Sequence, residues 1–262
     1  MIIRKSRKDL DRIADAGSIV ARCHELLRSQ AKPGTTTGEL DAIAEAFIRG
    51  EGGVPTFKGY LGFTGSICVS PNEMVVHGIP GPYALRDRDV LSVDIGVTLK
   101  GWVADSALTF VIGAAPAPPE VQQFLETCRL SLFDAIEQCV PGRRLSDLGH
   151  AVQTRVEGQG YGVIRELVGH GVGRKMHEAP QIANYGEPGK GPELKPGTVL
   201  AIEPMITMGH HAIKPDEHDG WSIYSADGSL TAHFEHTVAV TEDGPRVLTR
   251  HEGHSLVDDV VV

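Results

Sequence analysis

Closely spaced cysteine pairs are missing from this 262-residue sequence, which has four isolated cysteines: Cys23, Cys68, Cys128 and Cys139. Structural zinc sites usually need thiolates about two to four residues apart, and disulfide-stapled domains contain more cysteine. Long apolar runs are missing too, and the polar, basic segment 1–9 has no apolar core behind it. The sequence therefore predicts free thiols in the cytoplasm, with no membrane span and no export signal.

Basic charge is also scarce. The chain has 25 lysine and arginine residues against 34 acidic ones, which gives a formal net charge of −9, and it has no basic run that would follow a phosphate backbone. Nucleic acid is therefore not expected as the main partner. Hydrophobic residues make up 41% of the chain, enough to bury a core. We expect one domain over residues 1–262.

Apolar residues recur with helical spacing in four segments, near 7–31, 36–48, 119–139 and 146–158. Ser6 and the Thr36–Glu39 pair suit the N-caps of the first two helices. Proline-glycine pairs follow the first and third helices and should end them. Strand-like stretches are predicted at 66–70, 74–79, 90–98, 102–112, 163–168, 198–207, 221–225 and 230–241.

Two parts of the chain resemble each other at a constant offset of 108 residues. Segment 33–40 aligns with 141–148, and segment 49–52 aligns with 157–160. Each copy reads as a helix, a Pro-Gly turn, a helix, glycines and then strands. Chance is the alternative, because such turns are common. We favour a two-fold duplication, with halves at about 8–113 and 119–248 and a site at their junction.

Four carboxylates lie inside apolar, strand-like runs: Asp94, Asp105, Glu203 and Glu235. A single acidic residue in a strand usually faces water, but the same-side neighbours of these residues are not generally charged. If the four converge, they repel one another, and two divalent cations would neutralise their summed charge of about −4. Carboxylates with one imidazole suit Mn, Fe(II), Co or Zn.

The imidazole is expected from the segment GHGVGRKMHEAP, residues 169–180. Glycines on both sides of His170 allow a close approach of the backbone. A glycine-rich turn with two incidental histidines is the alternative. His177 and Glu178 begin an HExxH pattern, but Gln181 stands where the second histidine would be, so a zincin motif is excluded.

The order Asp94, Asp105, His170, Glu203, Glu235 resembles the five-ligand dimetal set of the methionine aminopeptidase/prolidase family. The resemblance extends from about residue 8 to residue 248. Its longest matches are NEMVVHGIP (72–80), VDIG (93–96), GHGVGRKMHEAPQI (169–182), IEPMI (202–206) and FEHTVAVTEDG (234–244). It implies an α+β "pita-bread" fold, in which two pseudo-symmetric halves share a curved, mainly antiparallel sheet with helices on its outer face.

Within that family, three features resemble the bacterial, type 1 methionine aminopeptidases. His77 in VVHGIP matches a substrate-contacting histidine, the chain lacks the extra N-terminal domain usual in prolidases, and no long insertion precedes Glu235. The resemblance implies a monomer that removes the initiator methionine of nascent polypeptides and prefers small penultimate residues. Transient contact with the ribosome is expected.

The resemblance also implies the role of each metal ligand. Asp94 would chelate one ion, Asp105 and Glu235 would bridge both, and His170 and Glu203 would bind the other. The ions would be Co, Mn, Fe(II) or Zn. Water between two cations loses a proton readily, and Glu203 would move that proton.

Substrate contacts are implied for further residues. His77 and His177 would hydrogen-bond the scissile amide. Four residues match positions that line a methionine pocket: Tyr60, Phe63, Cys68 and Trp221. Tyrosine is more usual than phenylalanine at position 63, and simple core packing is the alternative for these four. The other histidines, among them His210, His211, His218, His251 and His254, are interpreted as surface groups.

Two rival functions follow from the same resemblance. A prolidase-like peptidase would cleave X-Pro peptides instead of methionyl peptides. A binding module that has lost catalysis is the second alternative, because the same fold occurs in proteins that bind RNA or histones. Such modules typically lack metal ligands, whereas all five are present in this chain.

Overall fold

Four long helices form where the sequence predicts them. The computed structural model describes residues 1–250. Its helices are α1 (Arg7–Gln30), α2 (Thr37–Gly50), α3 (Pro119–Glu137) and α4 (Leu145–Gly158), and a short 3₁₀ turn, η1, covers Tyr60–Gly62. The Ser6 and Thr36 side chains cap α1 and α2 in complete capping boxes with Asp9 and Glu39. Among the described helices, none is long and apolar enough to cross a membrane.

The strands are short, except for one long hairpin, and every strand pairing in residues 1–250 is antiparallel. They form four small sheets, ordered β1-β4-β2 with β5 on β4, β13-β10-β6, β11-β12-β3 and β15-β14-β9-β7-β8. The strands are β1 (Val54–Pro55), β2 (Cys68–Pro71), β3 (Met74–Val76), β4 (Val90–Leu99), β5 (Trp102–Val111), β6 (Gly162–Val163), β7 (Gly169–Gly171), β8 (Glu178–Ile182), β9 (Val199–Ile202), β10 (Met205–Thr207), β11 (Ile213–Pro215), β12 (Ile223–Ser225), β13 (Thr231–His233), β14 (His236–Thr241) and β15 (Gly244–Val247).

The strand predictions fail at identifiable places. The predicted strand 163–168 is wrong over most of its length, because pairing stops at Val163 and resumes in the glycine-flanked β7. Besides β7, four strands were not predicted: β1, β8, β11 and β15 each contain a proline and each lie at the edge of a sheet. Proline cannot donate a hydrogen bond to a β-ladder but is tolerated at sheet edges. A proline within a short segment therefore argued against a strand, although these segments pair as edge strands.

The two halves of the chain repeat the same local structure. The Pro-Gly turns end α1 and α3 with Gly34 at φ 94° and Gly142 at φ 88°. The amide of Gly34 donates to the carbonyl of Leu85, and the amide of Gly142 donates to Leu194. Isolated bridges then join corresponding residues, Thr36 with Ala84 and Arg144 with Glu193. The sequence similarity therefore corresponds to two helix pairs tied to their own halves by matching hydrogen bonds.

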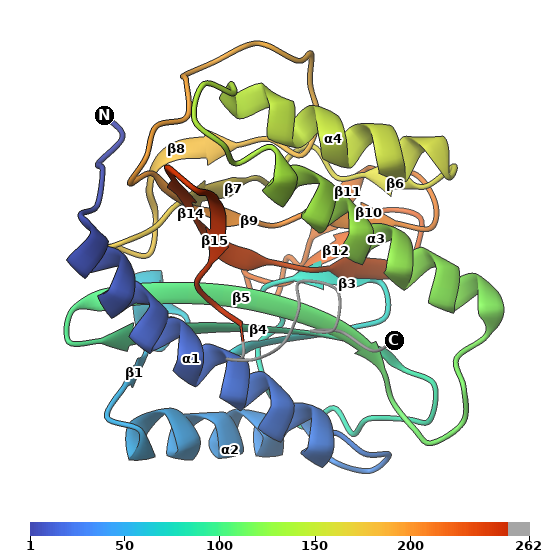
Figure 1. The fold of residues 1–262 in the computed structure, drawn as a ribbon. Coiled ribbons are helices and arrows are strands. Elements are labelled where there is room, and N and C mark those ends of the chain that lie inside the picture. Colours follow the sequence, from blue (N-terminus) through green and yellow to red (C-terminus); the bar gives the residue numbers. More distant parts are fainter. Residues whose placement is uncertain (251–262) are drawn as a thin grey trace.

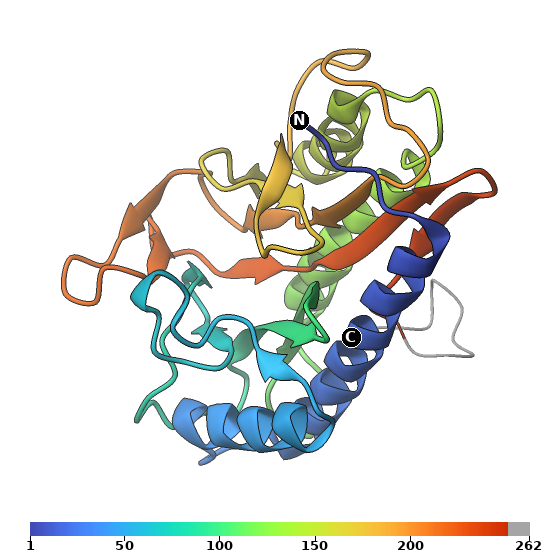
Figure 2. The same cartoon turned by 90° about the vertical axis from the view of Figure 1, so that its left-hand side faces the viewer.

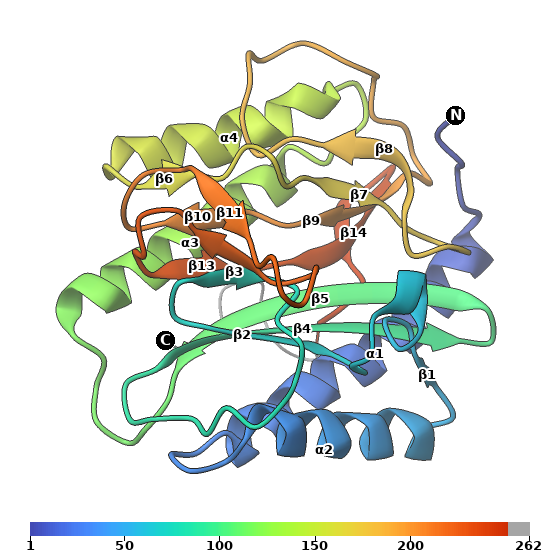
Figure 3. The same cartoon turned by 180° about the vertical axis from the view of Figure 1, so that it is seen from behind.

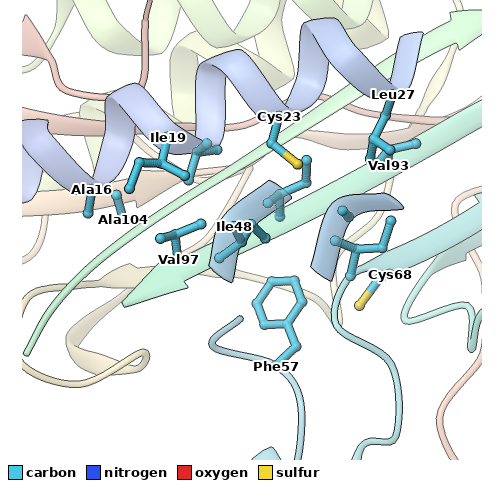
Figure 4. Close-up of a cluster of buried hydrophobic side chains, with 14 of the residues drawn as sticks. Ala16, Ile19, Cys23, Leu27, Ile48, Phe57, Cys68, Val93, Val97 and Ala104 are labelled. Atoms are coloured by element: carbon cyan, nitrogen blue, oxygen red, sulfur yellow. The ribbon is translucent and has the colours of Figure 1, made fainter. Parts of the chain in front are cut away.

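Each helix pair covers its own half of the strands. The two pairs are separated in Figure 1, with α1 and α2 beside β4 and β5 and with α3 and α4 beside the second half. Strands come to the front when the molecule is turned round (Figure 3), and the quarter turn in Figure 2 shows α1 crossing obliquely past α2. Ala16, Ile19, Cys23 and Leu27 of α1 pack with Val93, Val97 and Ala104 of the β4–β5 hairpin in one apolar core (Figure 4). A second core lies under α3 and α4.

The halves meet where β5 runs antiparallel to segment 233–237, and side-chain hydroxyls supply most of the hydrogen bonds there. Thr237 Oγ1 donates to the Asp105 carbonyl at 2.8 Å and accepts from the Asp105 amide at 3.0 Å. Thr109 Oγ1 makes the same two contacts with the carbonyl and amide of His233. This junction, called the seam below, fixes the strands that carry the site.

We predict that Thr237→Val lowers the free energy of unfolding by about 1–3 kcal/mol. Valine keeps the shape of threonine but leaves the buried amide and carbonyl of Asp105 without a partner. Urea unfolding of the metal-free protein measures the change. Thr154→Val on the exposed face of α4 is the matched control, with an expected change within about 0.5 kcal/mol. Equal effects of the two substitutions would show that the seam hydroxyl is dispensable.

Candidate metal centre

The five residues predicted as metal ligands come from both sides of the seam and line one cavity of about 350 Å³. Asp94 lies on β4 and Asp105 on β5, His170 lies on β7, Glu203 directly follows β9, and Glu235 lies between β13 and β14. Asp94 stands opposite Ala107 in the β4–β5 ladder, and Asp105 stands opposite Gly96. The two aspartates are therefore diagonal neighbours on one face of the hairpin.

One ligand atom from each of Asp105, His170 and Glu235 lies within 4.8 Å of the other two. His170 Nε2 is 3.8 Å from Asp105 Oδ2 and 3.5 Å from Glu203 Oε1. Its other ring nitrogen, Nδ1, lies 3.0 Å from the carbonyl of Gly171. That contact requires Nδ1 to carry the proton, so the lone pair of Nε2 faces the carboxylates.

Glycines allow His170 to occupy this position. A Cβ on Gly169 would lie 2.5 Å from the carbonyl oxygen of Ala201, and one on Gly171 would lie 2.2 Å from that of Ala179. Both distances are shorter than real Cβ contacts. The prediction of close backbone approach around His170 is therefore confirmed at both glycines.

In the absence of a cation, burial and neighbouring charges raise the pKa of all four carboxyl groups. Burial raises the pKa of Asp94 to about 7, with Glu203 adding to the rise, and burial likewise raises the pKa of Glu203 to about 7. Burial raises the pKa of Asp105 and of Glu235 well above the usual range, and neighbouring carboxylates raise both further. Asp105 and Glu235 are each only 2% exposed.

Buried carboxylate oxygens without hydrogen-bond partners indicate which kind of ligand this cluster can bind. Asp94 Oδ1, Asp105 Oδ1 and Glu235 Oε1 are buried and have no hydrogen-bond partner in the part of the chain that the structure describes. Buried polar atoms are normally paired, and carboxylate oxygens left unpaired around an imidazole suit a divalent cation. The donor set therefore fits metal ions.

The predicted substrate-contacting residues line the same cavity: Tyr60, Phe63, Cys68, His77, His177 and Trp221. The Phe63 and Trp221 rings meet edge to face with centroids 5.2 Å apart. Cys68 stands opposite Asp94 in the β2–β4 ladder, so it lies where the apolar lining meets the carboxylates. Burial, with a contribution from Asp94, raises the pKa of the Cys68 thiol well above its usual range, which makes it a poor nucleophile.

The two predicted amide-contacting histidines are held differently. His77 has φ 61°, an unusual conformation for a residue other than glycine, and a Cβ on the next residue, Gly78, would lie 2.1 Å from the carbonyl oxygen of Val69. Burial lowers the pKa of His77 to about 4, so this ring is neutral at physiological pH. His177 is anchored by its Nδ1, which lies 2.8 Å from the hydroxyl of Tyr60.

Sequence reasoning missed several residues of the cavity. Phe57, Leu61, Met176 and Met205 add to its apolar lining, and His233 lies beside Glu203 and Glu235. The interpretation of the remaining histidines as surface groups is wrong for His233 and also for His24 and His236, all of which are buried. It holds for His210 and His218, whereas His211 is partly buried. His251 and His254 lie outside the described residues. The missed signal for His233 was its alternation with Glu235.

Comparisons with known proteins find the same family over most of the chain. The model of "Metallopeptidase family M24" matches residues 11–242. Methionine aminopeptidase 1 of Bacillus subtilis is 50% identical over 250 residues, covering 95% of this chain and 100% of that protein. A crystal structure of methionine aminopeptidase from Rickettsia prowazekii superposes with a TM-score of 0.93 at 35% identity, covering 95% of this chain and 100% of that one. A prolidase from Pyrococcus furiosus shares the pita-bread fold, with a TM-score of 0.77 at 22% identity, and this chain covers 66% of it.

We predict that the metal-free protein loses stability as the pH rises. A carboxyl group whose pKa is higher in the folded chain contributes stability that is present below its unfolded pKa of about 4 and lost through its folded pKa. For Asp94 and Glu203 that loss extends through about pH 7. Thermal unfolding after chelation should therefore show a Tm that falls between about pH 5 and 8.

Two comparisons check this prediction. Saturating Mn²⁺ should flatten the fall in Tm, because bound cations compensate the carboxylates. The metal-free Glu235→Gln variant should show a shallower fall, because it has one ionising group fewer. A Tm that stays level or rises over this range without metal would contradict the assigned crowding.

Proposed function

Because the chain belongs to metallopeptidase family M24, we propose that it removes the N-terminal methionine from nascent polypeptides by hydrolysing their first peptide bond. The chain is a metal-dependent aminopeptidase by its likeness to methionine aminopeptidases along its full length. The observation that carries this proposal is one cavity in which a carboxylate–imidazole cluster adjoins an apolar lining. The preference for small penultimate residues is part of the proposal.

In this proposal the cluster would hold two divalent ions, chosen from Co, Mn, Fe(II) and Zn. Asp94 would bind one ion, His170 and Glu203 would bind the other, and Asp105 and Glu235 would be shared by both. Three orphaned carboxylate oxygens support this assignment. When bound, the ions lower the pKa of water and so supply a nucleophile near neutral pH.

Glu203 moves the proton of the reaction. Its side chain is 13% exposed and lines the cavity, and burial raises its pKa to about 7 in the absence of a cation. It takes the proton from the attacking water and returns it to the leaving amine. The Asn184 side chain donates to the Glu203 carbonyl at 2.9 Å and fixes the backbone at this residue.

His77 and His177 bind the scissile amide, one from each half of the chain. Tyr60 holds Nδ1 of His177, which leaves Nε2 of that ring for the substrate. His77 is neutral, so it donates one N–H without adding a positive charge beside the ions. A donor that engages most strongly as the amide becomes tetrahedral lowers the barrier rather than the ground-state energy.

Apolar groups select methionine. Phe63, Trp221 and Cys68, together with Met176 and Met205, offer an apolar and polarizable lining that suits an unbranched thioether. Phe63 packs against Trp221 without a hydroxyl, so this pocket selects by shape rather than by a hydrogen bond at that position. The proposal includes a cytoplasmic location, a monomeric enzyme and transient contact with the ribosome, where nascent polypeptides emerge.

The activity is tested with a peptide panel. The protein should release methionine from Met-Ala-Ser, lose this activity after chelation and regain it with Mn, Co or Fe(II) more than with Mg, which prefers all-oxygen ligands. Asp105→Ala, which removes a bridging carboxylate, should be inactive. Cleavage of an X-Pro peptide instead of Met-Ala-Ser would support the prolidase alternative, and no hydrolysis with metal bound would support the binding module.

We predict that His77→Ala lowers kcat on Met-Ala-Ser about 10²–10³-fold while KM changes little. The physical reason is that His77 stabilises charge on the amide mainly in the transition state. Steady-state kinetics measure the change, with His150→Ala on the exposed face of α4 as the control. A kcat within about twofold of the parent would remove His77 from the mechanism.

A further inference from the structure

An imidazole outside the five-residue ligand set points into the same cluster. The His233 side chain is 2% exposed, and its Nε2 has no hydrogen-bond partner among residues 1–250. This atom lies 3.7 Å from Glu203 Oε2 and 4.0 Å from Glu235 Oε2. Like one carboxylate oxygen each of Asp94, Asp105 and Glu235, it is a buried polar atom whose hydrogen-bonding capacity is unsatisfied.

Strand alternation and the seam fix the direction of this side chain. Ala232 and Phe234 belong to the apolar core under α3, so His233 and Glu235 point to the opposite side, toward the cavity. Thr109 Oγ1 contacts both the amide and the carbonyl of His233, at 2.9 and 2.7 Å. The Thr109 hydroxyl therefore fixes the backbone that carries the imidazole through both its amide and its carbonyl group.

The His233 and His170 side chains lie at similar distances from the Glu203 carboxylate. His170 Nε2 is 3.5 Å from one oxygen of Glu203, and His233 Nε2 is 3.7 Å from the other. Both separations exceed the usual limit of about 3.2 Å for an N–H···O hydrogen bond. Two ligands that bind one ion at about 2.0–2.1 Å lie no more than about 4.2 Å apart, and each of these separations satisfies that limit.

We propose that His233 is a sixth protein ligand of the metal centre, which supplies a second imidazole beside Glu203 and Glu235. The proposal rests on the metal-dependent function proposed above. A second nitrogen donor favours Zn, Co and Fe(II) over the more oxygen-preferring Mn and Mg. His233 therefore contributes to the choice of metal as well as to affinity.

The decisive experiment observes the histidine rings directly. Protein labelled with ¹⁵N in histidine is stripped of metal and titrated with diamagnetic Zn²⁺, and ring-nitrogen resonances are followed by NMR. His170→Gln and His233→Gln assign the two signals, and the exposed His150 serves as the unliganded reference. Two rings, those of His170 and His233, should change to the metal-bound shift.

The possible results separate the two proposals. If His170 changes and His233 keeps the shift of a free neutral ring, the metal centre stands and the sixth ligand is disproved. If neither ring changes, the metal centre itself fails, and this inference fails with it. A His233 signal that moves only slightly, as expected for an imidazole that donates to Glu203 without binding metal, also overturns the proposal.

A second measurement uses metal affinity. Competition with a chromophoric chelator should show that His233→Gln loses Zn²⁺ affinity at least about tenfold and loses less Mn²⁺ affinity, whereas His150→Gln changes neither. Circular dichroism verifies that each variant is folded. Zn²⁺ affinity of folded His233→Gln within about twofold of the parent would contradict the assignment.

Discussion

Asp94, Asp105, Glu203 and Glu235 hold four carboxyl groups around one cavity, and groups this close repel one another once ionised. Water cannot compensate Asp105 and Glu235, because each is only 2% exposed. Without cations the cluster therefore retains protons, as the pKa values raised by burial and by neighbouring carboxylates show. Divalent cations bound at this cluster would compensate the carboxylates, so stability and catalysis would depend on the same ions.

The seam explains how the chain holds such a cluster in place. A regular ladder between β5 and segment 233–237 would use the backbone groups of both strands, whereas Thr109 and Thr237 hydroxyls bridge them instead. Each bridging hydroxyl contacts the backbone at a cluster residue, Asp105 or His233. The apolar cores on either side keep both strands from shifting. The predicted ligands come from both halves of the chain, and the two cores and the seam between them hold those halves together.

The parts of the fold and site that the sequence predicted are those with a local signal. All four helices have periodic apolar positions, and α1 and α2 also have capping residues. Four of the five predicted ligands, all except Asp105, lie in motif matches that resemble a known family. The proline-containing edge strands were missed because their pairing depends on neighbours distant in sequence. His233 was missed because its alternation with Glu235 shows only that the two side chains share a face, not which side chains from other strands that face meets. Only the folded structure brings its Nε2 toward Glu203 and Glu235.

The cavity is lined by residues from strands and by residues from turns. Four of the five predicted ligands lie on strands or directly after one, whereas most of the residues predicted to contact substrate lie on turns: Tyr60 in η1, His77 after β3, His177 before β8 and Trp221 before β12. Several of these turns contain left-handed residues, including Leu61 at φ 48° and His77 at φ 61°. These turns lie outside the strands of the seam, although Tyr60 and Trp221 also pack against the first apolar core. Selection of the substrate can therefore change in this architecture while the chemistry of the carboxylate cluster is retained.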